Sequence, residues 1–142
     1  MIAESLICLA LNVYHEAKNQ SFIGQVAVAQ VVMNRVKDNR YPNNVCDVVK
    51  QGLTYKWKPS LPIKNRCQFS WYCDGKPDDI TDEYTYNQLH KLAESLVTSN
   101  FKILLDITDG ALYYHADYVK PKWSRKFERT VKIGRHIFYK RR

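Results

Sequence analysis

The chain has 142 residues, of which 45% are hydrophobic, and it carries a formal net charge of +8. This length suits one ordinary domain over residues 1–142, and the apolar content is enough for a core, which excludes an intrinsically disordered chain. The longest apolar runs have only a few residues, far short of the ~20 that a membrane-spanning helix needs, so no stable membrane insertion is expected.

The N-terminal segment predicts an amphipathic helix over about residues 2–18. Leu9, Val13 and Ala17 recur at helical spacing, and Glu16 falls on the same stripe. A carboxylate on an apolar stripe loses hydration, which favours its protonated form, and a protonated glutamic acid can act as a general acid on a glycosidic bond. Spacing alone favours the simpler alternative, a half-exposed Glu16 at the fraying helix end with no role.

A second helix is expected over about residues 22–37, with Ser21 as its N-cap. It is apolar nearly all round, which is typical of a buried central helix, and its length favours a helix over a strand despite its many valines. Turn residues occupy 38–44. A short helix is expected over 45–50, ended by Gly52.

Residues 53–79 show no clear period and predict a long loop region, which in a small domain is usually functional or disordered. Its aromatic residues argue against disorder. Aromatic rings on loops suit stacking on sugar rings or bases, although filling a small satellite core is equally common.

The C-terminal half predicts one more long helix and a small antiparallel element. The helix is expected over 82–100, with Thr81 as its cap. A strand is expected over 111–115, and a hairpin over 130–139 that turns at Gly134. Helices therefore dominate, and the predicted fold class is α+β, mainly α.

The four cysteines fit no zinc-binding spacing and the four histidines are scattered, so no metal or other cofactor is expected. Cys8 lies among apolar helix residues and is expected to be a buried thiol. Cys46, Cys67 and Cys73 flank the loop-rich middle segment, where one bridge is plausible, and Cys67–Cys73 would close the shortest loop. Such a bridge would suit an oxidising site of action.

The positive charge favours a polyanionic partner: nucleic acid, anionic lipid or an acidic cell-wall polymer. Basic residues concentrate after residue 119, and a solvated surface would explain such a tail equally well. The first residues, Met1-Ile2-Ala3-Glu4, contain an acid and no basic segment, so no secretory signal is visible.

Several blocks then stand out in a fixed order along nearly the whole chain. They read VYHEAKNQ, GQVAVAQVVMNRV, YPNNVCDVV, CQFSWYCDG, YYHADYVKPKW and IGRHIFYK. In these blocks and their spacing the sequence resembles the SleB/CwlJ-type cell-wall hydrolases. The resemblance implies a lysozyme-like domain with a small sheet or hairpin at one side of a glycan cleft, which cuts peptidoglycan, commonly as a lytic transglycosylase with one catalytic glutamate.

The family glutamate maps onto Glu16, our candidate catalytic residue. Many members carry a second glutamate where this chain has Gln20, so Glu16 is the only acid in the motif. Members with a Thr-His pair differ at Leu112 and Tyr113, which puts any precise role of position 113 in doubt. The candidates for lining the glycan groove are Gln68, Ser70, Trp71, Tyr113, Tyr114 and His115.

A single acid suffices if the substrate supplies its own nucleophile. In the transglycosylase route, the C6 hydroxyl of N-acetylmuramic acid attacks C1 of the same sugar while Glu16 donates and then accepts a proton. His115 or a tyrosine hydroxyl could stabilise developing charge. Trp123 fits a core or a groove equally well.

Three alternatives stay open. One is plain hydrolysis by muramidase or glucosaminidase action; another is a wall-binding domain without catalysis. The third is a basic nucleic-acid-binding module, which explains the charge but shows no recognised motif. We expect a monomer that acts on peptidoglycan glycan strands, not nucleic acid, at the bacterial cell wall or periplasm. With no visible signal, we expect a phage lysin released through a membrane lesion or a protein whose leader is missing.

Overall fold

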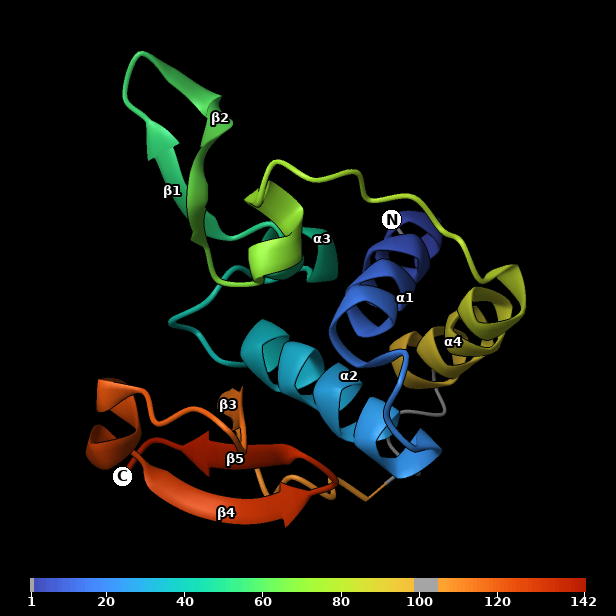
Figure 1. The fold of residues 1–142 in the computed structure, drawn as a ribbon, viewed down its shortest axis with the longest axis vertical. Coiled ribbons are helices and arrows are strands. Elements are labelled where there is room, and N and C mark those ends of the chain that lie inside the picture. Colours follow the sequence, from blue (N-terminus) through green and yellow to red (C-terminus); the bar gives the residue numbers. More distant parts are fainter. Residues whose placement is uncertain (1, 99–104) are drawn as a thin grey trace.

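The computed structural model describes residues 2–98 and 105–142. In this part of the chain, helices α1 (Ile2–Ala17), α2 (Phe22–Lys37) and α4 (Glu83–Val97) pack around one core, closed by the short helix α3 (Val45–Val49). A small sheet lies on the other side of α2 (Figure 1). No helix in the described ranges has the length and apolar character needed to cross a bilayer.

Helix α2 is central because it is apolar on both sides, as its sequence predicts. Val28 and Val32 pack in the core shared with the other helices, whereas Ala27 and Val31 pack against the sheet side with Phe138. The Ser21 hydroxyl accepts a hydrogen bond from the backbone N–H of Gly24 at 3.2 Å, which confirms the predicted cap. The predicted bounds of α1 and α2 are also confirmed.

The sheet has the strand order β3-β5-β4 and is antiparallel throughout. Its strands are β3 (Tyr113–Ala116), β4 (Glu128–Ile133) and β5 (His136–Lys140). Strands β4 and β5 form the predicted hairpin, and Gly134 at the turn has a φ of 58°, which glycine adopts without strain. The predicted fold class, α+β and mainly α, is confirmed.

The prediction of a loop over residues 53–79 is wrong in its first part. Strands β1 (Gly52–Tyr55) and β2 (Lys58–Cys67) pair as a hairpin that projects from the helical body (Figure 1), and the 3-10 helix η1 (Ser70–Cys73) follows. Nearly all side chains of this hairpin are exposed on both faces, so the alternation that reveals a half-buried strand is missing.

The start of α4 also differs from the prediction. Its cap is Asp82, whose carboxylate accepts a hydrogen bond from the backbone N–H of Thr85 at 3.0 Å, and the Thr81 backbone N–H instead donates to the Tyr14 hydroxyl at 3.1 Å. Aspartate is as good a cap as threonine, and Tyr14 engages the segment before it. The predicted helix end at residue 100 lies outside the described residues.

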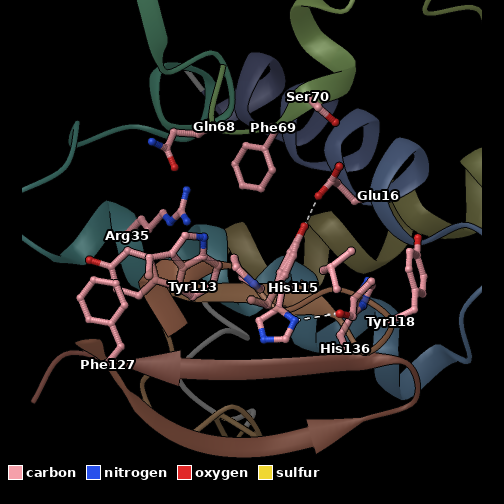
Figure 2. Close-up of a pocket in the computed structure, with 15 residues that line it drawn as sticks. Glu16, Arg35, Gln68, Phe69, Ser70, Tyr113, His115, Tyr118, Phe127 and His136 are labelled. Atoms are coloured by element: carbon pink, nitrogen blue, oxygen red, sulfur yellow. Dashed lines mark hydrogen bonds between the residues drawn. The ribbon is translucent and has the colours of Figure 1, made fainter. Parts of the chain in front are cut away.

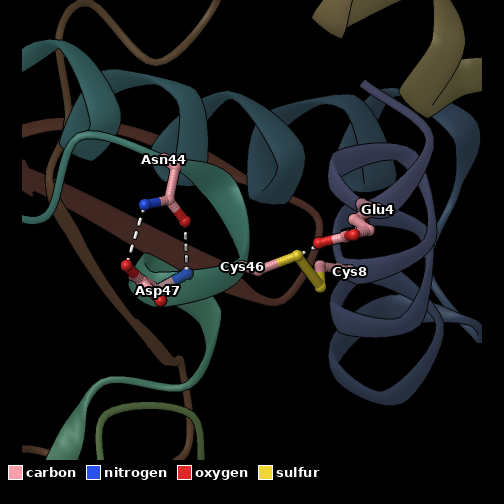
Figure 3. The surroundings of a disulfide bond; sticks show 5 residues. All are labelled: Glu4, Cys8, Asn44, Cys46 and Asp47. Atoms are coloured by element: carbon pink, nitrogen blue, oxygen red, sulfur yellow. Dashed lines mark hydrogen bonds between the residues drawn. A yellow bond between two sulfur atoms is a disulfide. The ribbon is translucent and has the colours of Figure 1, made fainter. Parts of the chain in front are cut away.

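All four cysteines are paired. The Cys67–Cys73 bridge is confirmed, and it joins the end of β2 to η1. The prediction of a free, buried Cys8 is wrong: Cys8 pairs with Cys46 and ties α1 to α3 (Figure 3). Cys8 lies on the half-exposed side of α1 that faces α3, and sequence spacing holds no information on a partner 38 residues away.

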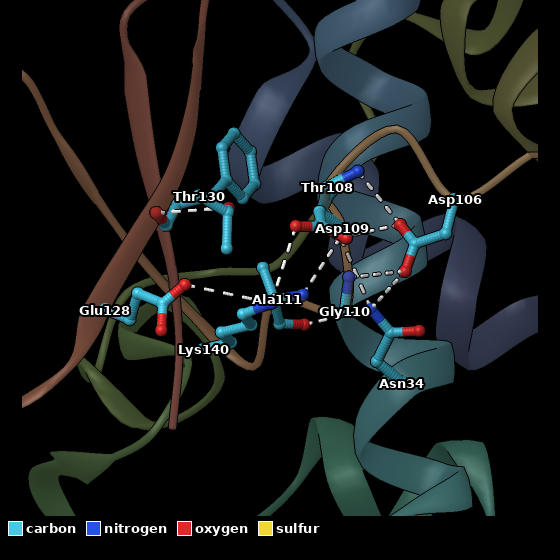
Figure 4. Close-up of polar contacts among 10 residues, drawn as sticks. Asn34, Asp106, Thr108, Asp109, Gly110, Ala111, Glu128, Thr130 and Lys140 are labelled. Carbon is cyan, nitrogen blue, oxygen red and sulfur yellow. Dashed lines mark hydrogen bonds and ion pairs between the residues drawn. The ribbon is translucent and has the colours of Figure 1, made fainter. Parts of the chain in front are cut away.

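Asn34 fastens α2 to the segment that leads into β3 (Figure 4). Its amide donates to Asp106 Oδ2 at 2.9 Å and to the Ala111 carbonyl at 3.0 Å. Because Asn34→Ala leaves these acceptors without their donor, we expect the free energy of unfolding to fall by about 1–3 kcal/mol in urea denaturation. Asn39→Ala, in the exposed turn after α2, is the matched control and should change stability little; an equal loss in both variants would contradict the role of Asn34.

Candidate active site

A cleft of about 840 Å³ lies between the end of α1, the segment after β2 and the C-terminal sheet (Figure 2). Its walls come from segments far apart in the sequence, which the packing of α2 between helices and sheet brings together. The lining residues include Glu16, Arg35, Gln68, Phe69, Ser70, Tyr113, Tyr114, His115, Tyr118, Trp123, Phe127 and His136.

Glu16 lies in the last turn of α1, and its carboxylate points into the cleft (Figure 2). Burial raises the pKa of Glu16 above its ordinary value, because the charged form loses hydration. A hydrogen bond from Tyr114 and the positive charge of Arg35 act in the opposite direction without cancelling this effect. The helix end therefore presents a carboxyl group that holds its proton to a higher pH than an exposed glutamate.

Tyr114, on β3, donates its hydroxyl hydrogen bond to Glu16 Oε1. Its ring is held against Phe138 at a centroid distance of 5.6 Å and edge-on to His136 at 5.0 Å. Burial raises the pKa of Tyr114 well above its ordinary value, and the neighbouring Glu16 charge adds to this. The hydroxyl therefore stays protonated and acts as a fixed donor to the carboxylate.

Arg35 is a cleft residue that the sequence analysis missed. It projects from α2, and its Nε donates to the Leu112 carbonyl at 2.8 Å. The guanidinium carbon lies 5.2 Å from the ring centroids of both Tyr41 and Phe69. The available signal was a charged residue inside a largely apolar helix, although a basic residue in a last helical turn is common on electrostatic grounds alone.

The structure brings five of the six predicted groove residues to the cleft: Gln68, Ser70, Tyr113, Tyr114 and His115. Trp71 does not line it. Its indole N–H donates to Asn12 Oδ1 at 2.8 Å and its ring stacks on His15 at 4.6 Å, so it packs against α1 instead. The contacts of these residues with a glycan stay predictions. Trp123, left open between core and groove, lines the cleft.

His115 is less available for contact with a substrate than its position in the cleft suggests. Its Nε2 shares a hydrogen bond with the Tyr139 hydroxyl and its Nδ1 with the Ala116 carbonyl, both at 2.8 Å. Both ring nitrogens are thus engaged within the protein, which favours a role for His115 in supporting the cleft wall.

Among the described residues that line the cleft, Glu16 is the only carboxylate. Asp117, close by in sequence to the β3 residues, is held in ion pairs with Lys132 at 3.3 Å and Arg135 at 3.6 Å. The described ranges contain no group of three or more His, Cys, Asp or Glu residues placed to hold a metal ion. The cleft offers proton transfer at one carboxyl group, flanked by a cation and aromatic rings.

Tyr114→Phe is expected to raise the pKa of Glu16 further. The hydroxyl stabilises the ionised carboxylate, so its loss favours the protonated form. A ¹³C NMR titration of the Glu16 side-chain carboxyl should show its midpoint at higher pH in the variant than in the parent. Tyr84→Phe, exposed on α4, should leave the midpoint in place. A midpoint that is unchanged or lower in Tyr114→Phe would rule out this coupling.

The chain is similar to known proteins over most of its length. A family model described as Cell Wall Hydrolase matches residues 19–139. The spore cortex-lytic enzyme of Bacillus cereus is 32% identical over 133 residues, which make up 93% of this chain and 42% of that enzyme. The chain therefore spans less than half the length of this curated relative. The matched family range includes every cleft residue named above except Glu16, which lies just before it.

Two solved structures share the fold. The catalytic domain of the Bacillus cereus SleB protein matches with a TM-score of 0.66 at 29% identity, over 97% of this chain and 91% of that one. The catalytic domain of the germination-specific lytic transglycosylase SleB from Bacillus anthracis matches with a TM-score of 0.65 at 30% identity, over 96% of this chain and 93% of that one.

Proposed function

Because the chain belongs to the cell wall hydrolase family, we propose that residues 1–142 form a single catalytic domain that cleaves peptidoglycan glycan strands as a lytic transglycosylase. The observation that carries the proposal is Glu16, the single carboxyl group among the described residues that line the cleft, with its raised pKa. The names of the relatives, spore cortex-lytic enzyme and lytic transglycosylase, support the same reaction class.

In the proposed reaction, protonated Glu16 donates its proton to the oxygen that links C1 of N-acetylmuramic acid to the next sugar. The C1–O bond breaks, and the C6 hydroxyl of the same muramic acid forms a new bond to C1. Ionised Glu16 then takes the proton of that hydroxyl, which restores the acid and leaves a 1,6-anhydro sugar. The attack is intramolecular, so it needs no second carboxylate to activate water.

The neighbours of Glu16 suit this cycle. Tyr114 holds the carboxylate in one orientation through its hydroxyl, and it stabilises the ionised form that exists between the two proton transfers. Arg35 favours the same ionised form electrostatically. Burial opposes both and holds the pKa of Glu16 above its ordinary value, which favours proton donation.

Hydrolysis is the competing reaction. An inverting glycosidase places a second carboxylate roughly 6.5–9.5 Å from the first, and a retaining one roughly 5–5.5 Å away. The described cleft lining supplies no such group, which favours the transglycosylase route.

Mass spectrometry of a peptidoglycan digest tests the proposal. Because the relatives are named for the spore cortex, both vegetative sacculi and cortex fragments belong in the assay. Muropeptides with 1,6-anhydromuramic ends are the expected product. New reducing ends in their place would replace transglycosylation with hydrolysis, and intact strands after long digestion would overturn the enzymatic function.

The disulfides and the net charge bear on where the domain acts. The two disulfides suit an oxidising compartment, and the positive charge would attract an anionic wall. We therefore place the domain at the bacterial cell wall, as a monomer that binds glycan strands. That it is a phage lysin stays a prediction.

A further inference from the structure

Arg35 is a buried charge in the wall of the cleft. The residue is only 5% exposed, yet it contributes to the lining. Nε is bonded to the Leu112 carbonyl, whereas Nη1 is buried with no hydrogen-bond partner among the described residues. Burying a guanidinium is costly unless its charge and its donors are matched, so the protein alone leaves this group incompletely satisfied.

The Arg35 guanidinium lies among aromatic rings. Aromatic rings of Tyr41, Phe69 and Tyr113 lie 5.2, 5.2 and 5.8 Å from the guanidinium carbon. A cation over the face of an aromatic ring is stabilised by that ring. Such contacts do not satisfy the N–H groups of the guanidinium, which donate in its plane. The Nη groups therefore have no hydrogen-bond partner among the described residues, although Arg35 lines the cleft.

No described carboxylate forms an ion pair with Arg35. Glu16 acts on Arg35 through its charge, but the Glu16 carboxylate is bonded to Tyr114. In the protonated state that Glu16 needs as an acid, even this charge is absent. Among the described residues, the wall of the cleft thus contains a buried cation that is not ion-paired with any carboxylate.

Figure 2 shows the Arg35 guanidinium pointing into the cleft, with the Gln68 amide directed toward it from the segment after β2. An amide can donate or accept, so it can share one anionic oxygen with an arginine. A planar fork of donors beside an amide is a good match for a carboxylate, and charge-assisted bonds of this kind are short and strong.

We propose that Arg35 and Gln68 form a subsite of the cleft that binds a carboxylate group of the substrate. The inference rests on the proposed glycan cleavage and adds to it a determinant of substrate choice. Peptidoglycan offers such a carboxylate from two sources: the lactyl group of muramic acid where the stem peptide has been removed, and the stem peptide itself where it is present.

Four substrates test the subsite with the unmodified protein. They are peptide-stripped strands with free lactyl carboxylates, the same strands converted to N-methylamides, intact strands with stem peptides, and intact strands with their peptide carboxylates converted likewise. Neutralising the recognised carboxylate should raise KM roughly tenfold to a hundredfold with little change in kcat. A difference within the stripped pair identifies the lactyl source, and one within the intact pair identifies the stem peptide.

Variants add a second readout at fixed ionic strength. Arg35→Gln should erase the difference within the sensitive pair, because the charged partner is gone. Arg35→Lys keeps the positive charge but loses the planar pair of N–H donors, so part of the difference between the two substrates should return. Arg129→Gln makes the same change in net charge on exposed β4 and should preserve the whole difference. Thermal unfolding of each variant checks folding, and the comparison of substrates needs no variant.

Equal cleavage of all four substrates by the parent protein would overturn the subsite while leaving the proposed function in place. A loss in Arg35→Gln that is the same for carboxylate and amide substrates would also overturn it, since Arg35 would then be only structural. Failure to cleave any of the four would overturn the proposed function and the subsite together.

Discussion

Glu16→Gln is expected to lower kcat for glycan cleavage by roughly 10²–10⁴-fold, the usual contribution of a general acid–base group. The amide has the shape of the carboxyl group and can still accept the Tyr114 hydrogen bond, but it has no proton to donate at neutral pH. The measurement is release of soluble muropeptides under saturating substrate. Retention of more than a tenth of the parent kcat would remove Glu16 from the catalytic role.

The same variant separates catalysis from folding. Because burial raises the pKa of Glu16 in the folded protein, its neutral form favours folding at low pH, and this stability is lost as pH rises through the folded pKa. Gln cannot ionise. Glu16→Gln should therefore match the parent in urea denaturation at low pH and exceed it in stability at higher pH. Glu94→Gln, exposed on α4, is the control and should retain both activity and the parent pH dependence.

Much of this fold is readable from the sequence because its long helices each bury a definite side. α1 shows apolar residues at helical spacing, and α2 is apolar nearly all round because it packs on helices and sheet at once. The turn at Gly134 is equally visible, since few residues tolerate its positive φ. The resemblance to cell-wall hydrolases then made Glu16 the candidate catalytic residue, for which spacing alone predicted no role.

Other features depend on contacts that leave no periodic trace. The β1–β2 hairpin buries almost nothing, so no alternation marks it. Trp71 looked like a loop aromatic free to contact glycan, but a hydrogen bond to Asn12 and stacking on His15 turn it toward α1. Arg35 became a cleft residue only when β3 and the segment after β2 were placed beside α2. Each of these outcomes was decided by a partner far away in sequence.

The two disulfides are expected to contribute differently to stability and to activity, and double Cys→Ala variants can separate the two effects. Cys8 and Cys46 are 38 residues apart, so their bridge removes much more freedom from the unfolded chain than Cys67–Cys73, with a separation of 6. By loop-closure entropy, the long loop contributes roughly 4 kcal/mol and the short loop roughly 2 kcal/mol. Cys8→Ala with Cys46→Ala should therefore cost about twice as much unfolding free energy in urea as Cys67→Ala with Cys73→Ala.

The loss of activity should follow the opposite order, with the larger loss on removal of the short bridge. The Cys67–Cys73 bridge encloses Gln68, Phe69 and Ser70, which line the cleft, whereas Cys8–Cys46 lies away from it between α1 and α3. A small displacement of groove residues can cost a large factor in rate, so loss of the short bridge should lower kcat/KM roughly tenfold or more. Loss of the long bridge should leave kcat/KM near the parent value at temperatures where the variant is folded. If both double variants lost stability and activity in the same proportion, the short bridge would only stabilise the fold and would not position the groove residues.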